Sequence, residues 1–155
     1  MRGSGIKIEL ADADSSEARA CIDAYYRELQ ERFEAGFDPG MTVSANPEEL
    51  TPPAGYFFLA WLDDVAVGCI ALKVKADSGE IKRMWVAQNA RGRGIAQQLL
   101  NAIEAVARQI GIKKLQLDTN RSLTEAKTLY LRNGYVEIPA YNDNPYADHW
   151  FEKRL

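Results

Sequence analysis

The chain has 155 residues, of which 46% are hydrophobic and 26% are charged, the balance of one ordinary globular domain. A net charge of -3 and an isoelectric point of about 5.3 argue against a nucleic-acid binder, which usually carries a basic stripe. The longest apolar runs, residues 56–62 and 65–72, are too short to span a bilayer, so we expect no membrane partner.

The first third of the chain predicts a strand followed by a long helix. Residues 6–10 alternate apolar and polar side chains, which is the period of a half-buried strand. Asp14 followed by Glu17 resembles a capping box, so we expect a helix over 15–33. Residues 1–4 are expected to be a loose tail or an expression remnant, outside a single domain at 5–155.

The middle of the chain predicts a meander of antiparallel strands. The segment before it, residues 41–54, holds prolines without a clear period and predicts a loop with one helical turn near Glu48. Short turns then join runs rich in apolar and aromatic residues, and such short connections favour antiparallel pairing. We expect these strands at 56–62, 65–75 and 80–86.

The second half alternates helices and strands. Apolar residues between Ile95 and Ile110 recur with the period of an amphipathic helix, and Gly111 stands where a left-handed C-cap is expected. This helix links strand 80–86 to a strand at 114–118, and such a crossover makes the two strands parallel. Further on we expect a helix at 122–132, a strand at 135–138, a loop at 141–147 and a final edge strand at 148–153. The fold class is therefore α/β (mixed α+β): one mixed sheet, antiparallel in its N-terminal part with a parallel central pair, flanked by helices.

The segment Arg91-Gly92-Arg93-Gly94 lies between a strand and a helix and has the chemistry of an anion site. Glycine lets the backbone approach an anion, and the first N–H groups of the helix point toward it with the positive end of the helix dipole. We therefore expect a phosphate or pyrophosphate here, the alternative being a glycine turn with solvated arginines. The Walker pattern is absent, and Gln97 stands where the dinucleotide fingerprint needs a third glycine or alanine.

Three motifs, in order along the chain, resemble the GNAT superfamily of N-acetyltransferases. Residues 88–96 are similar to its pyrophosphate loop, although Asn89 stands where Gln or Arg is usual. Glu80-Ile81 is similar to its Glu-Ile strand, and residues 126–135 are similar to its Ala-x-x-Leu-Tyr-x-x-x-Gly-aromatic pattern. The resemblance covers the chain from Tyr56 to its end, and the residues before Tyr56 agree only in the order of elements.

The resemblance implies a GNAT-like fold and an acyltransferase that takes acetyl-CoA as donor, releases CoA and acetylates an amine directly in a ternary complex. The two parallel strands would splay, and the backbone of Met84, Trp85 and Val86 would hold the thioester carbonyl. Asn120 is expected to contact CoA, because Leu123 stands where many relatives carry an asparagine for this purpose. The remaining expected cofactor contacts are Arg91, Gly92, Arg93, Gly94, Ile95, Ala96 and Lys127.

Glu80 and Tyr130 are the catalytic residues that the resemblance indicates. An amine has a pKa of about 10 and arrives protonated, so a base has to take its proton before attack. Glu80 is expected as that base, with His149 as a second option; the alternatives are a solvated glutamate and a structural histidine. Tyr130 takes the family's general-acid position toward the leaving thiolate, and the alternative is a tyrosine that only packs.

An acidic and aromatic rim is expected to bind the amine, the alternative being a solvated helix face over core aromatics. Its members are Tyr25, Glu28 and Phe33 on the first helix, with Tyr141 from the C-terminal loop. A small-molecule acceptor is favoured, because the proline-rich segment before the meander is long enough to cover the site. A protein or peptide acceptor and a non-catalytic acyl-CoA-binding module are the alternatives.

The two cysteines, the single histidine and the last strand bear on metal binding, cellular compartment and oligomeric state. Cys21 and Cys69 lie within apolar patterns and are expected in the core, and neither they nor His149 has metal-ligand spacing, so we expect no metal. Two isolated cysteines favour a reducing, cytoplasmic location. The sequence does not determine the oligomeric state; many relatives are dimers, and the expected exposed edge strand at 148–153 would allow a homodimer by strand pairing.

Overall fold

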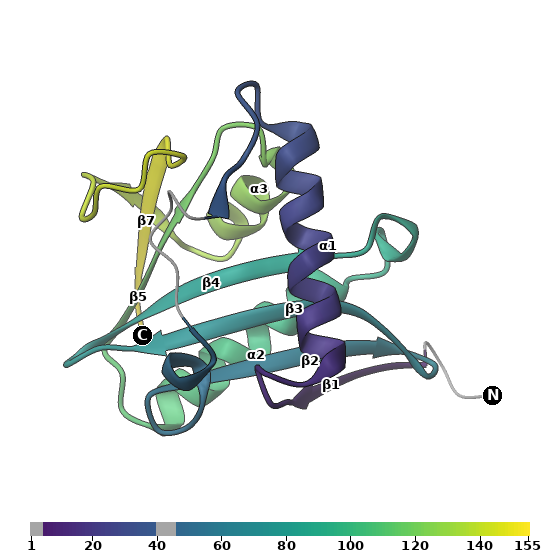
Figure 1. Cartoon of the computed structure of the whole chain (residues 1–155). Helices are drawn as coiled ribbons and strands as arrows, with labels where there is room; N and C mark the ends of the chain where they lie inside the picture. Colours follow the sequence, from purple (N-terminus) through teal and green to yellow (C-terminus); the bar gives the residue numbers. More distant parts are fainter. Residues whose placement is uncertain (1–4, 40–45) are drawn as a thin grey trace.

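The computed structural model describes residues 5–39 and 46–155, so the expected tail at 1–4 and residues 41–45 of the expected loop lie outside it. Its centre is one seven-stranded sheet in the order β1-β2-β3-β4-β5-β7-β6 (Figure 1). The strands are β1 (Ile6–Leu10), β2 (Gly55–Leu62), β3 (Val65–Val74), β4 (Ser78–Val86), β5 (Lys114–Thr119), β6 (Val136–Ile138) and β7 (His149–Arg154). The helices are α1 (Ser16–Arg32), α2 (Ile95–Gln109) and α3 (Thr124–Arg132), with the 3-10 turns η2 (Pro47–Leu50) and η3 (Gln88–Ala90).

The sheet confirms the mixed topology that the sequence predicts. β1 to β4 form an antiparallel meander, and β4 pairs with β5 in parallel. The expected edge position of 148–153 is wrong, because β7 lies between β5 and β6. β7 pairs with β5 along its whole length, from Lys114↔Arg154 to Thr119↔His149, which leaves the short β6 at the edge.

The two faces of the sheet are covered by different helices. Along β3, Ile70 and Leu72 face one way and join the core under α2, whereas Cys69 and Ala71 face the other way and join the core under α1. Figure 1 shows α1 in front of the sheet and α2 behind it. The expected burial of both cysteines is confirmed.

The long helices follow the sequence patterns with two corrections. Along α2 the buried side chains are Ile95, Leu99, Leu100, Ile103 and Ala107, as predicted, and Gly111 takes the expected left-handed conformation with φ 86°. Ile110 is 41% exposed, because the helix already ends at Gln109. The start of α1 is also different, because Ser15 is the N-cap and Asp14 pairs with Arg19 instead.

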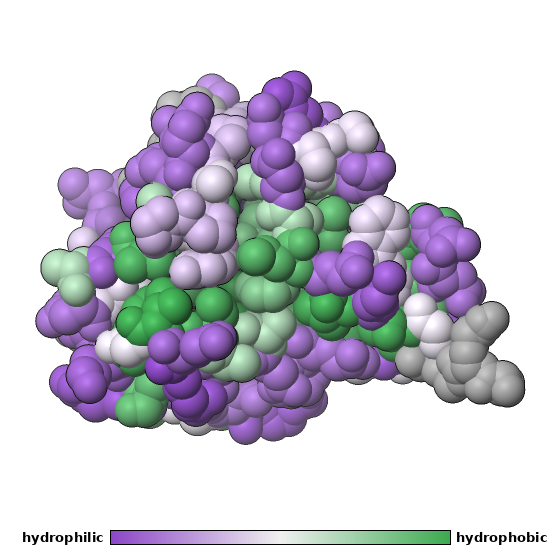
Figure 2. All heavy atoms as spheres, turned by 90° about the horizontal axis from the view of Figure 1, so that it is seen from below, coloured by the Kyte–Doolittle hydropathy of each residue, from purple (hydrophilic) through white to green (hydrophobic). Residues whose placement is uncertain are grey.

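The face seen in Figure 2 carries apolar side chains in its middle, surrounded by hydrophilic side chains. A folded chain always exposes part of its apolar surface, so this distribution alone marks no partner. Among the residues that the structure describes, no helix has the length and apolar character needed to cross a membrane.

Candidate active site

The strands β4 and β5 pair over only three positions, from Ser78↔Lys114 to Glu80↔Gln116, and then diverge. A β-bulge in β4 follows, because the register with β3 moves from Ala71↔Lys82 to Cys69↔Trp85 and so leaves one extra residue in β4. A bulge bends its strand, which accounts for the divergence.

The bulge holds Arg83 in the left-handed region, with φ 57°. This conformation is uncommon for a residue with a side chain and costs about 1–3 kcal/mol when the surroundings impose it. The buried thiol of Cys69 donates to the Arg83 carbonyl across 3.1 Å and supports the bend. No sequence signal indicated this feature, because arginine is not a typical left-handed residue.

Two neighbouring cavities lie beside the divergence. We call the first the inner cavity; its lining includes aromatic side chains of α1, the bulge of β4, the end of β5 and Tyr130 of α3. We call the second the loop cavity; its lining includes the end of β4, the 91–96 segment and the face of α3. The two cavities have five lining residues in common, which are Tyr25, Leu29, Met84, Leu123 and Ala126. The two cavities are therefore adjacent, the loop cavity at the glycine-rich segment and the inner cavity at the interior of the divergence.

The glycine-rich segment forms an open end of the loop cavity. Gly92 and Gly94 have φ 82° and 78°, values that favour glycine. A Cβ placed on either glycine would meet no atom within 4 Å, so the space above the segment is open. Gly94 is also the N-cap of α2 and supplies no side-chain cap, so the first N–H groups of α2 remain available to an anion.

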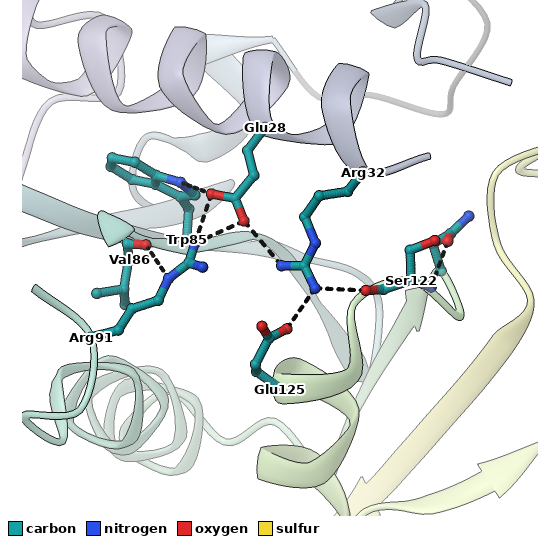
Figure 3. A network of polar contacts seen from close by, with 8 residues as sticks. Glu28, Arg32, Trp85, Val86, Arg91, Ser122 and Glu125 are labelled. Carbon is teal, nitrogen blue, oxygen red and sulfur yellow. Dashed lines mark hydrogen bonds and ion pairs between the residues drawn. The ribbon is translucent and has the colours of Figure 1, made fainter. Parts of the chain in front are cut away.

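Glu28 binds Arg91 and thereby fastens the glycine-rich segment to α1 (Figure 3). The two oxygens of Glu28 accept from Nη2 of Arg91 at 2.6 and 2.8 Å, and Nε of Arg91 donates to the Val86 carbonyl at 3.0 Å. Nε1 of Trp85 also donates to Glu28, at 3.1 Å. Burial alone would raise the pKa of Glu28, but the hydrogen bonds from Arg91 and Arg32 outweigh it and lower the pKa.

Arg32 extends this network to α3. It donates to Glu28 at 3.0 Å, to the Ser122 carbonyl at 2.6 Å and to Glu125 at 2.8 Å (Figure 3). The expected contact of Glu28 with the amine is therefore not supported, since Glu28 lines the loop cavity and holds two arginines. The guanidinium of Arg91 is likewise bound by Glu28, whereas the side chain of Arg93, between Gly92 and Gly94, is exposed.

Tyr25, Phe33 and Tyr130 all line the inner cavity, and their roles toward the amine and the thiolate stay predictions. Tyr130 is 4% exposed, and burial together with the nearby charge of Asp118 raises its pKa above the usual tyrosine value. Burial is also the main cause of the raised pKa of Tyr25, to which Tyr130 and Asp118 contribute. Both hydroxyls therefore keep their protons at neutral pH.

Glu80 and Tyr141 lie together but outside the lining of either cavity. The Tyr141 hydroxyl donates to Glu80 at 2.8 Å, and the Glu80 carboxylate also contacts the ammonium groups of Lys75 at 3.4 Å and Lys82 at 3.6 Å. Burial and the Glu80 charge raise the pKa of Tyr141. The expected roles of Glu80 as base and of Tyr141 as amine contact are not supported by these positions, because the carboxyl is 4% exposed and already has three partners.

Asn120 and Lys127 also differ from expectation. Asn120 lines the inner cavity rather than the loop cavity, and its side chain donates to the Tyr146 carbonyl at 2.6 Å and accepts from the Ser122 N–H at 2.8 Å. Its side chain therefore holds the C-terminal loop, and its contact with CoA stays a prediction. Lys127 lies off the cavity face of α3, and Arg132 is the cation of α3 that lines the loop cavity.

His149 lies away from both cavities, whereas Asp118, for which the sequence analysis gives no role, lines one of them. His149 contacts Glu137 at 2.7 Å and lines neither cavity, so its position does not support a role as base. Asp118 lines the inner cavity together with Tyr130, although the sequence analysis names it only as the last residue of the strand at 114–118. A signal for it exists in the alternation of β5, where Leu115 and Leu117 are buried and Asp118 lies on the opposite face.

Comparisons with known proteins agree with this geometry. The family model described as the acetyltransferase (GNAT) family matches residues 22–135. The chain is 34% identical over 133 residues to the aminoalkylphosphonate N-acetyltransferase of Salmonella typhimurium, a match that covers 81% of this chain and 80% of that protein. It is 35% identical over 92 residues to the IAA acetyltransferase of Azospirillum brasilense, covering 58% of this chain and 60% of that protein, which is less than two thirds of the relative. Its structure is similar to that of the PaiA N-acetyltransferase of Thermoplasma acidophilum in complex with coenzyme A, with a TM-score of 0.74, 17% identity and coverage of 96% of this chain and 99% of that chain.

Proposed function

The chain belongs to the GNAT family of acetyltransferases, and on this premise we propose that it moves an acetyl group from acetyl-CoA to the primary amine of a small molecule. The observation that carries the proposal is that the loop cavity and the inner cavity are adjacent and share five lining residues. The donor is proposed to bind in the first and the acceptor in the second, so that the two meet at the shared residues, as direct transfer in a ternary complex requires.

The loop cavity has the chemistry that a CoA pyrophosphate needs. Its open end combines Gly92 and Gly94, the N–H groups of Ile95 and Ala96 at the start of α2, and the exposed Arg93 nearby. Acetyl-CoA, when bound, supplies the activated acyl carbon and the thiolate leaving group. The solved relative from Thermoplasma acidophilum was obtained with coenzyme A, which supports the same donor class.

The end of β4 is proposed to stabilise the reacting carbonyl. Past Glu80 the parallel ladder with β5 ends, so the edge of Met84, Trp85 and Val86 that faces β5 has no strand partner there. Backbone N–H groups on such an edge stabilise negative charge that develops on an oxygen during acyl transfer. They are already in place before the reaction and need no rearrangement.

Tyr130 is proposed as the general acid for the leaving thiolate. It lies in the inner cavity beside the residues common to both cavities, and its raised pKa keeps its proton available. Glu80 does not enter this proposal as the base, because it lies outside the cavity lining. The ammonium of the acceptor instead loses one proton to water before attack. The acylated nitrogen then gives up a second proton, which restores Tyr130 after Tyr130 has protonated the thiolate. A small-molecule acceptor is favoured over a peptide, since the Salmonella relative is named for aminoalkylphosphonates.

The test is release of CoA from acetyl-CoA over a panel of primary amines, with Tyr130→Phe compared with Tyr135→Phe. Both tyrosines are buried, but Tyr135 lines neither cavity and donates to Glu104 at 2.8 Å. We expect Tyr130→Phe to lower kcat about 100-fold with little change in the KM for acetyl-CoA. Tyr135→Phe should lower the melting temperature and leave kcat within about twofold.

Two outcomes would contradict the proposal. Binding of acetyl-CoA without CoA release for any amine would favour a non-catalytic acyl-CoA-binding module. Full activity of Tyr130→Phe would remove the general-acid role. Double-reciprocal plots that stay parallel as both substrates vary would exclude the ternary complex, because they indicate a covalent intermediate.

A further inference from the structure

Asp118 is a carboxylate placed at the centre of the proposed chemistry. It follows the last residue pair of β4 with β5, Glu80↔Gln116, and therefore lies beyond the point where the two strands diverge. It lines the inner cavity together with Tyr25 and Tyr130. Its charge contributes to the raised pKa of both tyrosines, after the effect of burial.

The C-terminal loop fixes both oxygens of Asp118. Nδ2 of Asn142 donates to Oδ2 at 2.7 Å, and Nδ2 of Asn144 donates to Oδ1 at 3.1 Å. The oxygen of Asn142 accepts in turn from Nε1 of Trp150 at 3.0 Å, and the oxygen of Asn144 accepts from the Tyr146 N–H at 3.0 Å. These second bonds orient each amide so that its NH₂ group faces the carboxylate.

The amide donors orient the carboxylate but do not neutralise it. Within residues 5–39 and 46–155, no lysine, arginine or histidine forms an ion pair with Asp118, and residues 40–45 contain no charged residue. The cations of β4 that line the cavity have contacts elsewhere, Lys82 with Glu80 at 3.6 Å and Arg83 with the Tyr26 hydroxyl at 3.4 Å. A half-buried charge of this kind is normally balanced by a partner, and a bound cation supplies one.

The other side chains that line the inner cavity indicate which kind of carbon skeleton carries the cationic group. The rings of Phe33, Phe37 and Tyr146 form one cluster, with centroids 5.8 Å apart for Phe33–Phe37 and 4.9 Å apart for Phe37–Tyr146. All three rings line the cavity, and Tyr26 joins them at 5.3 Å from Phe37. Aromatic rings bury an apolar skeleton and also attract a cation through their faces.

We propose that Asp118 binds the ammonium group of the acceptor and, with the aromatic cluster, selects primary amines carried on an aromatic or apolar skeleton. This inference rests on the proposed acetyltransferase function and adds the acceptor class to it. Asp118 recognises the amine in this proposal, a role for which the sequence analysis names Glu28 and Tyr141.

The experiment compares Asp118→Asn with Asp143→Asn, using 2-phenylethylamine as acceptor. Asp143 lies exposed in the same loop, so its substitution removes the same charge outside the cavity. We expect Asp118→Asn to raise the KM for 2-phenylethylamine about 10- to 100-fold, because a charge-assisted contact is lost. The Asp143 variant should stay within about twofold of the wild type, and neither change should alter acetyl-CoA binding by calorimetry.

A neutral probe separates recognition of charge from damage to the cavity. 2-Phenylethanol has the same skeleton without the ammonium, so its inhibition constant should be equal in wild type and Asp118→Asn. An equal loss for amine and alcohol, or an unchanged KM for the amine, overturns the inference. If Asp118→Asn loses acetyl-CoA binding, Asp118→Glu takes its place: it keeps the charge and should keep most of the amine affinity, and a loss as large as that expected for the asparagine overturns the role.

The wild type itself separates this inference from the proposed function. A protein that binds acetyl-CoA and acetylates other amines, but not 2-phenylethylamine, contradicts the acceptor class and leaves the transferase function standing. A protein that does not bind acetyl-CoA contradicts the proposed function first.

Discussion

The helices α1 and α2 begin with opposite arrangements. At the start of α1, the Ser15 hydroxyl accepts from the Ala18 N–H at 3.2 Å, and Glu17 places a negative charge in the first turn. At the start of α2, Gly94 offers no side chain, and the first turn contains no acidic residue. The first helix satisfies one of its first N–H groups with its own cap, whereas the second has no side-chain cap and leaves these groups available to a bound anion. The comparison teaches that a missing cap next to open space can belong to a function rather than to a weak helix.

The largest expected effect comes from filling the open start of α2. Gly92→Glu adds a side chain and a negative charge to the space above the segment, so acetyl-CoA affinity should fall about 100-fold or more. Gly111→Glu is the matched control: Gly111 also has a positive φ, of 86°, and open space at its Cβ, but follows the opposite end of α2. Equal losses in both variants, measured by calorimetry, would mean that backbone strain and not the anion site causes the effect.

Removal of the N-cap of α1 should have the next largest effect. It should change the stability of the fold and leave acetyl-CoA binding unchanged. Ser15→Ala leaves the Ala18 N–H without its side-chain acceptor, which should lower the free energy of unfolding by about 1 kcal/mol. Urea denaturation measures this change, and the KM for acetyl-CoA should not move. A change in KM would indicate that the two helix starts are coupled and that the comparison is too simple.

Adding an acid to the first turn of α2 should separate stability from binding. Gln98→Glu keeps the shape of the side chain and interacts favourably with the helix dipole, so the unfolding free energy should rise by about 0.5 kcal/mol. Acetyl-CoA affinity should fall about threefold at low salt, because the added charge repels phosphate, and the loss should shrink as salt screens it. Tighter binding of acetyl-CoA by this variant would contradict an anion site at α2.

Substitution of Glu28, which binds Arg91 ahead of α2, is expected to have the smallest effect, and this effect is on stability and its pH dependence. The folded pKa of Glu28 lies below its ordinary value of 4.5, so its stabilising contribution is complete above that value and is lost as pH falls through the folded pKa. Glu28→Gln should therefore be less stable than wild type at neutral pH, and the difference should narrow below about pH 4.5. Thermal melts across this range provide the measurement, and a constant difference would contradict the role of the carboxylate charge.

The parts of the fold that depend on local pattern could be predicted from the sequence. The apolar period from Ile95 to Ala107, the C-cap at Gly111 and the strand-loop-helix setting of Gly92 and Gly94 all express residues near one another in the chain. The motif at 126–135 singles out Tyr130 as a candidate general acid, and the structure places this residue in the lining of the inner cavity. Periodicity and turn chemistry are local, so they hold before the fold is known.

The parts that depend on distant partners could not be predicted. Arg91 and Glu28 are 63 residues apart, and only the fold shows that one binds the other. The insertion of β7 between β5 and β6 is a pairing between strands that are distant in the chain, which no local pattern records. For Asp118, the alternation of β5 indicates only which face it lies on, because the contacts that fix its carboxylate come from Asn142 and Asn144 in another segment.

The most direct test of the central claim is calorimetric titration of the wild-type chain with acetyl-CoA, with ATP and NAD titrated in parallel. We expect acetyl-CoA to bind in the micromolar range, since the loop cavity has a candidate phosphate site and adjoins the inner cavity, and we expect the two nucleotides to bind far more weakly. No heat from acetyl-CoA at millimolar concentration, or tighter binding of ATP or NAD, would contradict the claim that the glycine-rich segment holds an acyl-CoA donor.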